Sequence, residues 1–89
     1  MKLRELFKDS SAWTQGTFAR NEKGERTSSL SQDSTQWCLY GGIIKCYPVK
    51  EQYDIQKKIE QKTNGVSISV FNDNNTFECI QQLVNNLDI

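Results

Sequence analysis

The chain has 89 residues, with 11 basic side chains, 11 acidic side chains and no histidine. This length favours one domain over residues 1–89 with a thin core, and the charge balance argues against general attraction to phosphate. The missing histidine removes Ser-His and Cys-His nucleophiles, and the longest apolar stretch, residues 37–44, is far too short to cross a bilayer.

The first part of the chain predicts a short helix followed by a β-hairpin. Leu3, Leu6 and Phe7 recur at helical spacing within residues 2–8. Residues 16–28 then place β-favouring side chains around a polar turn that ends in Gly24, where a positive φ is favoured. Because a lone hairpin is only marginally stable, we expect it to pack on helices or gain a third strand.

Two helices are predicted in the middle of the chain. The first covers residues 34–47, with Asp33 as its cap, and ends before Pro48 because the residue before a proline disfavours the α conformation. Its apolar residues are distributed around most of the helix circumference, which is typical of a helix buried on several sides. The second helix covers residues 49–63 and is mostly polar.

The last part of the chain predicts a strand and a helix. The alternation in VSISVF indicates a strand over residues 66–71, with Val66, Ile68 and Val70 on one face. Residues 76–87 carry the clearest amphipathic helical pattern. Together these elements predict an α+β fold with about four helices and a small antiparallel sheet made of the hairpin and strand 66–71.

Three segments taken together resemble a known family. WTQGTFARNEKG, DSTQWCLYGGI and FNDNNTFECIQQLV follow one another in the order found in an uncharacterised bacterial and phage family of domains of unknown function. The chain departs from that family at Gly42, where alanine is usual, and at Phe71, where tryptophan is common. The resemblance implies one shared structural unit and implies no activity.

The three cysteines are expected to be reduced and buried. Cys38 and Cys46 are eight residues apart, which on one helix is roughly 12 Å of rise and too far for a disulfide, so either would have to pair with Cys79. No C-x₂-C pair nucleates a metal site, and we expect no metal and no cofactor. Apolar neighbours would raise the pKa of the Cys38 thiol, which favours core packing over a nucleophile.

The pair Gly41-Gly42 lies inside a predicted helix, where each glycine costs about 1 kcal/mol relative to alanine. Either another segment of the chain packs closely against it, or a ligand occupies the space. We favour packing, because no phosphate-loop pattern surrounds the pair.

Five residues are candidates for binding. Tryptophan and arginine often anchor interfaces, and in a small protein they equally often cover the core. Asparagine and aspartate in a turn commonly bond neighbouring amides, and a role in surface contacts stays open. The candidates are Trp13, Gln15, Arg20, Asn72 and Asp73.

Three functional hypotheses follow. The leading one is a non-enzymatic cytoplasmic protein that binds another macromolecule, expected to be a protein, as an accessory or phage-type modulator. The first alternative is a small ligand-binding protein or enzyme with a pocket formed by Cys38, Asp73 and Arg20. The second is nucleic-acid binding through the lysines of helix 49–63 and the aromatic hairpin, although acidic residues interrupt the lysines. We expect no membrane partner, and the sequence does not give the oligomeric state.

Overall fold

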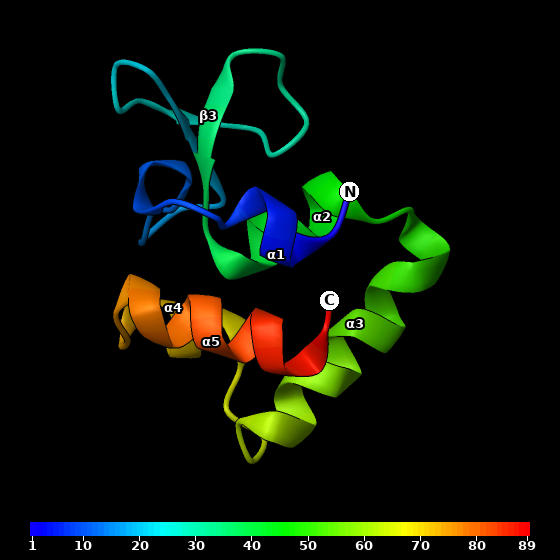
Figure 1. Ribbon diagram of the computed structural model, residues 1–89. Helices are drawn as coiled ribbons and strands as arrows, with labels where there is room; N and C mark the ends of the chain where they lie inside the picture. Colours follow the sequence, from blue (N-terminus) through cyan, green and yellow to red (C-terminus); the bar gives the residue numbers. More distant parts are fainter.

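The computed structural model describes residues 1–89 and has an α+β fold, with five α-helices and one three-stranded antiparallel sheet (Figure 1). The α+β class predicted from the sequence is therefore confirmed. In chain order the elements are α1 (Leu3–Leu6), the 3₁₀ turn η1 (Ser10–Ala12), β1 (Ala19–Asn21), β2 (Arg26–Thr27), β3 (Ser34–Trp37), α2 (Leu39–Cys46), α3 (Val49–Lys62), α4 (Ile68–Asp73) and α5 (Phe77–Leu87).

Helix α2 is the central element. Figure 1 shows the sheet and its loops at one end of the molecule, α3, α4 and α5 at the other, and α1 and α2 between them. Helix α2 contacts β3, α1, α3 and α4. The core that these elements share contains Leu3, Phe7, Ala19, Trp37, Leu39, Ile43, Ile55, Ile59, Ile68, Ile80, Leu83, Val84 and Ile89.

The sheet has the strand order β2-β1-β3. The predicted hairpin is present as β1 and β2, which pair antiparallel with Ala19 opposite Thr27. Its turn places Gly24 at φ +80°, as expected. Both hairpin strands are shorter than predicted. Before β1, the amide of Gly16 donates to Asp73 at the end of α4, and the carbonyl oxygen of Phe18 lies against Gly41 of α2.

The third strand comes from a segment predicted as helix, so the prediction of one helix over residues 34–47 is wrong at its start. Residues 34–37 form β3, with Trp37 opposite Ala19 of β1. The Trp37 indole is buried and donates to the carbonyl oxygen of Ser29 at 3.0 Å. Asp33 does not cap a helix and instead accepts hydrogen bonds from nearby side chains, including Thr27. Pairing of this segment with the free edge of β1 overrides its helical capping signal.

The predicted strand 66–71 is also wrong, because this segment contributes to helix α4. The hydroxyl of Ser67 caps the helix by accepting from the amide of Val70 at 3.4 Å. Ile68 is buried, whereas Val66 and Val70 are 39% and 51% exposed, so the alternating face is not buried. The inward residues are Ile68, Phe71 and Asn72, at helical spacing. β3 takes the second edge of the hairpin strand β1, so the third strand of the sheet comes from residues 34–37 and not from this segment.

Helices α3 and α5 agree with the sequence, whereas α1 is present but shorter than the predicted 2–8, at Leu3–Leu6. Helix α3 spans Val49–Lys62, close to the predicted 49–63, and buries Ile55 and Ile59 on an otherwise exposed surface. Helix α5 spans Phe77–Leu87, close to the predicted 76–87. Long periodic segments identify a helix from local pattern alone, because their apolar stripe fixes both the element type and the buried face.

Both glycines of the central helix contact other segments of the chain. A Cβ atom on Gly41 would lie 2.0 Å from the carbonyl oxygen of Phe18, and one on Gly42 would lie 2.9 Å from Cδ2 of Leu3 and 3.0 Å from the ring of Phe7. The absence of a side chain at Gly41 thus allows the Phe18 backbone to approach α2 closely, and its absence at Gly42 makes room for the side chains of Leu3 and Phe7. The expectation of close packing, rather than a ligand, is confirmed by these contacts.

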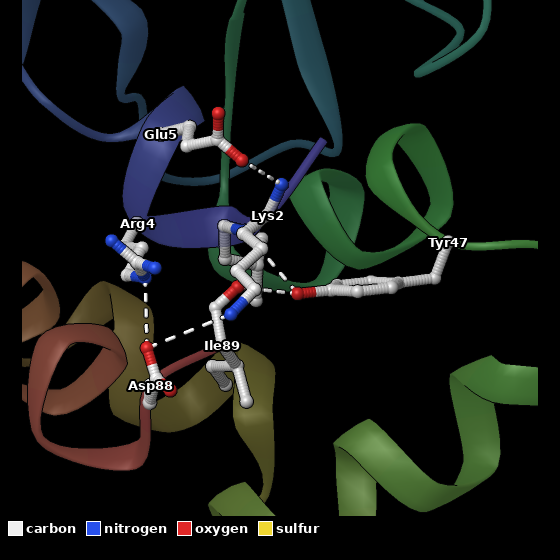
Figure 2. Close-up of polar contacts among 7 residues, drawn as sticks. Lys2, Arg4, Glu5, Tyr47, Asp88 and Ile89 are labelled. Atoms are coloured by element: carbon white, nitrogen blue, oxygen red, sulfur yellow. Dashed lines mark hydrogen bonds and ion pairs between the residues drawn. The ribbon is translucent and has the colours of Figure 1, made fainter.

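The two ends of the described chain are tied together beside α2 (Figure 2). The Tyr47 hydroxyl accepts from the amide of Leu3 at 3.3 Å and donates to the carbonyl oxygen of Ile89. The Asp88 carboxylate is 3.0 Å from Nε of Arg4 and 3.6 Å from Nζ of Lys2. These ion pairs are exposed and contribute little to stability, so the tyrosine and the buried Ile89 side chain are the main contacts at this point.

We predict that Gly41→Ala lowers the free energy of unfolding by about 3 kcal/mol, because the new methyl group would press on the Phe18 backbone and outweigh the better helix propensity of alanine. Gly42→Ala is the matched control. Its methyl group would meet the side chains of Leu3 and Phe7 at 2.9–3.0 Å rather than a backbone atom at 2.0 Å, and side chains can shift more easily than backbone, so we expect a loss below about 1.5 kcal/mol. Urea unfolding of both variants measures the difference. Equal losses would contradict the close approach of Phe18.

Candidate functional site

The five candidate residues meet at one junction, where the segment 13–20 packs against the C-terminal end of α4. This segment follows α1 and η1 and leads into β1. The residues that the structure brings together are Trp13, Gln15, Arg20, Asn72 and Asp73.

Asn72 is the centre of this junction and is fully buried. Its Oδ1 accepts from Nε1 of Trp13 at 2.7 Å and from the backbone amide of Leu39 at 3.0 Å. Its Nδ2 donates to the carbonyl oxygen of Thr14 and to Oδ1 of Asp73, both at 3.1 Å. Both lone-pair sites and both N–H groups of the amide are used, as a buried polar side chain requires.

Gln15 caps α4 from outside the helix. Its Nε2 lies 3.0 Å, 3.2 Å and 3.1 Å from the carbonyl oxygens of Asn72, Asp73 and Asn75. The last carbonyls of a helix have no partner within the helix. Because α4 has only six residues, this capping from a distant segment stabilises a helix that would not form alone.

The Arg20 side chain connects residues 14–15 to the hairpin turn. Its Nε donates to the Thr14 hydroxyl at 2.8 Å, its Nη1 to the carbonyl oxygen of Gly24 at 3.0 Å, and its Nη2 to that of Gln15 at 3.2 Å. The ion pairs of the chain are both made by Asp88, so Arg20 and Asp73 do not form one. The guanidinium group is therefore committed to internal contacts.

Most of the polar groups of the five candidates are satisfied inside the chain. Two side-chain oxygens are exceptions. Oε1 of Gln15 makes no hydrogen bond within the chain, and Asp73 uses its Oδ1, which accepts from the amide of Gly16 at 3.0 Å, but not its Oδ2. The network thus acts first as a scaffold for the segment 13–18. That these residues bind a partner stays a prediction.

A small hollow of about 140 Å³ lies on this scaffold. We call it the Asp73 hollow. Cys38 and Asp73 meet in it, as the pocket alternative requires, but Arg20 does not line it. Its walls are formed by Gly16, Thr17, Phe18, Cys38, Ser69 and Asp73.

The Cys38 thiol at the hollow is a helix cap and is poorly suited to act as a nucleophile. Burial raises the pKa of Cys38, the hydrogen bond from the amide of Gly41 to its Sγ lowers it, the Asp73 carboxylate raises it, and the net direction is upward. Since the thiolate is the reactive form and no histidine can serve as base, the arrangement leaves Cys38 protonated at neutral pH.

A second, larger hollow of about 500 Å³ lies between the hairpin turn and the loop before β3. Its walls carry no apolar side chain, unlike the mostly apolar sites that hold small molecules. A hydrogen bond from the hydroxyl of Ser31 lowers the pKa of the Asp33 carboxyl there. No group of three histidine, cysteine, aspartate or glutamate side chains is placed to hold a metal ion anywhere in the chain.

Phe18 is the residue at this site that the sequence did not single out. Its ring is 52% exposed and stacks on that of Tyr40, with 5.5 Å between ring centroids and 27° between planes. The exposure of Phe18 could have been predicted from its neighbour Ala19. Successive residues of a strand point to opposite faces, so a buried Ala19 implies that the Phe18 side chain points outward. The sequence also did not predict that Ser69 belongs to this site, because the segment 66–71 was expected to form a strand.

Comparisons with protein-family models, curated proteins and solved structures find no match to this chain. The resemblance to the bacterial and phage domain family therefore stays a prediction. None of the helices combines the length and apolar character that crossing a bilayer needs.

We predict that the three thiols differ sharply in alkylation rate, because all three are free and only Cys79 is exposed. The exposure of Cys79 corrects the expectation that every thiol is buried. Burial raises the pKa of Cys46 to about 11 and also raises that of Cys38, so few thiolates form at pH 8 at these two positions.

Iodoacetamide labelling at pH 8, read by mass spectrometry, should modify one site quickly and two sites slowly. In Cys79→Ser the fast phase should disappear, and in denaturant all three sites should react at similar rates. A fast phase that survives in Cys79→Ser and is lost in Cys38→Ser would contradict this assignment.

Proposed function

We propose that this chain is a non-enzymatic protein that acts by binding a protein partner, with the stacked pair Phe18 and Tyr40 as the contact. The observation that carries the proposal is the rigid presentation of a half-exposed aromatic ring. A role as a cytoplasmic accessory or phage-type modulator is part of the proposal and is supported by the small size of the chain, its lack of histidine and the family resemblance.

Hydrogen bonds to the backbone of residues 16 and 18 fix the position of Phe18. The amide of Cys38 donates to its carbonyl oxygen at 3.1 Å, and two residues earlier the amide of Gly16 donates to Asp73 at 3.0 Å. The close approach to Gly41 fixes the same carbonyl. An aromatic side chain on a fixed backbone loses little conformational entropy on binding, and such residues often contribute most of the affinity of an interface.

The enzymatic alternative has weaker support. Its pocket would need Arg20, which is engaged with Thr14, Gln15 and Gly24 outside the hollow. The raised pKa of Cys38 works against a nucleophile. A volume of about 140 Å³ is also below the roughly 300–1,000 Å³ of most small-molecule sites.

The nucleic-acid alternative also lacks a supporting arrangement. Nζ of Lys45 lies 5.7 Å from the Trp37 ring centroid, and Nζ of Lys57 lies 5.3 Å from that of Tyr53. These lysines cover aromatic rings of the same chain. Acidic residues separate the other lysines of α3, so the helix presents a mixed surface rather than a basic stripe.

We predict that Phe18→Ser abolishes capture of a partner that the wild-type chain retains from source-cell lysate. The ring is half exposed, so the substitution removes contact area while the fold persists. Tyr53→Ser is the control, because Tyr53 is a 64% exposed aromatic on α3, away from the proposed contact. Quantitative mass spectrometry of the captured proteins gives the readout.

The proposal fails if Phe18→Ser and Tyr53→Ser retain the same partner equally well. It also fails if the purified chain turns over a substrate and Cys38→Ala removes that turnover.

A further inference from the structure

We infer that the Asp73 hollow binds the ε-ammonium group of a lysine side chain on the protein partner. This inference rests on the proposed function, because it places the lysine next to the Phe18 and Tyr40 contact. It assigns a chemistry to the free oxygen of the Asp73 carboxylate, the one charged group of the junction that is not fully used within the chain.

The Asp73 carboxylate gives the hollow its charge. Its Oδ1 is fixed by the amide of Gly16 and by Nδ2 of Asn72, so the group has a defined orientation. The carboxylate has no ion-pair partner in the chain, and Oδ2 has no hydrogen bond. An oriented carboxylate with a free oxygen favours a cationic donor and disfavours an anion.

Two hydroxyl groups complete the set of acceptors. Thr17 and Ser69 line the hollow, and their hydroxyl groups make no hydrogen bond within the chain. A hydroxyl oxygen can accept, and an ammonium group has three donors and no acceptor. One carboxylate oxygen and two hydroxyl oxygens therefore match the hydrogen-bonding capacity of a single ammonium group.

Size and apolar contacts favour lysine over other cations. About 140 Å³ corresponds to roughly four or five water volumes, which accommodates an ammonium group and the end of its alkyl chain. Phe18 and Cys38 are the apolar residues that line the hollow, and the alkyl stem of a lysine can pack on such a surface while its charge reaches the carboxylate. The Cys38 thiol lies in the same hollow and stays neutral, so the charge comes from Asp73.

Arg20 limits the strength of this contact. Its Nη2 is 3.9 Å from where a Cβ atom on Gly16 would be, so a second positive charge lies near the hollow. Asp73 itself is exposed, and exposed ion pairs contribute little. We therefore expect the isolated amino-acid analogue to bind weakly and the lysine to act mainly by orienting the partner on Phe18.

The test is a titration of the ¹⁵N-labelled chain with Nα-acetyl-lysine methylamide, followed by the backbone amide shifts of Gly16, Ser69 and Asp73. These shifts should saturate with the analogue. The Nε-acetylated form of the same analogue, which lacks the charge, and potassium ion at equal concentration should leave them unchanged. Equal shifts with the acetylated form or with potassium would overturn the inference.

Asp73→Asn should weaken binding of the analogue about two- to fivefold, because it removes the charge while its Oδ1 can still accept from Gly16. Asp54→Asn on α3 carries the same charge change outside the hollow and should leave the affinity unchanged. Ser69→Ala, which breaks no internal hydrogen bond, should also weaken binding. Unchanged affinity in both Asp73→Asn and Ser69→Ala would overturn the inference.

The titration needs no partner, so its outcome is separate from that of the capture experiment. If the analogue does not bind while Phe18→Ser still loses the partner, the lysine site is wrong and the proposed function stands. If the analogue binds as described while Phe18→Ser retains the partner, the site stands as an amine site and the proposed contact is wrong.

Discussion

The buried amide of Asn72 is the interaction on which the arrangement of this chain depends. It joins three segments that are far apart in sequence: the end of α4, the first residue of α2 and the segment around Trp13. Each of these is short or irregular and has little stability alone. Because the amide is fully buried and fully bonded, loss of any one partner would leave a polar group without water or protein to satisfy it.

The exposed features follow from this buried one. With Trp13 and Thr14 fixed on Asn72, and with Gln15 on the end of α4, the chain must pass beside the start of α2. Gly41 lets the Phe18 backbone approach that helix closely, so the Phe18 ring is directed outward against Tyr40. A buried polar contact, rather than a large apolar core, thereby sets the geometry of the surface that we propose as the binding face.

The sequence predicts some of this and not the rest, for physical reasons. Helices α3 and α5 are long enough for their periodicity to identify them, and the Gly41-Gly42 pair correctly indicated close packing. In residues 66–71, the alternation of valine and isoleucine competes with the helical spacing of Ile68, Phe71 and Asn72. That competition is decided by Asn72 reaching Trp13, a contact that local pattern cannot show. The meeting of the five candidate residues depends on the same long-range contact.

The measurement that tests this account most directly is the urea unfolding free energy of Asn72→Ala beside that of Asn74→Ala. Asn72 is buried with four hydrogen bonds, whereas Asn74 is exposed and its side chain makes one, to the carbonyl oxygen of Val70. We expect Asn72→Ala to lose about 3 kcal/mol and Asn74→Ala less than about 1 kcal/mol. Equal small losses would show that the structure does not depend on the Asn72 junction.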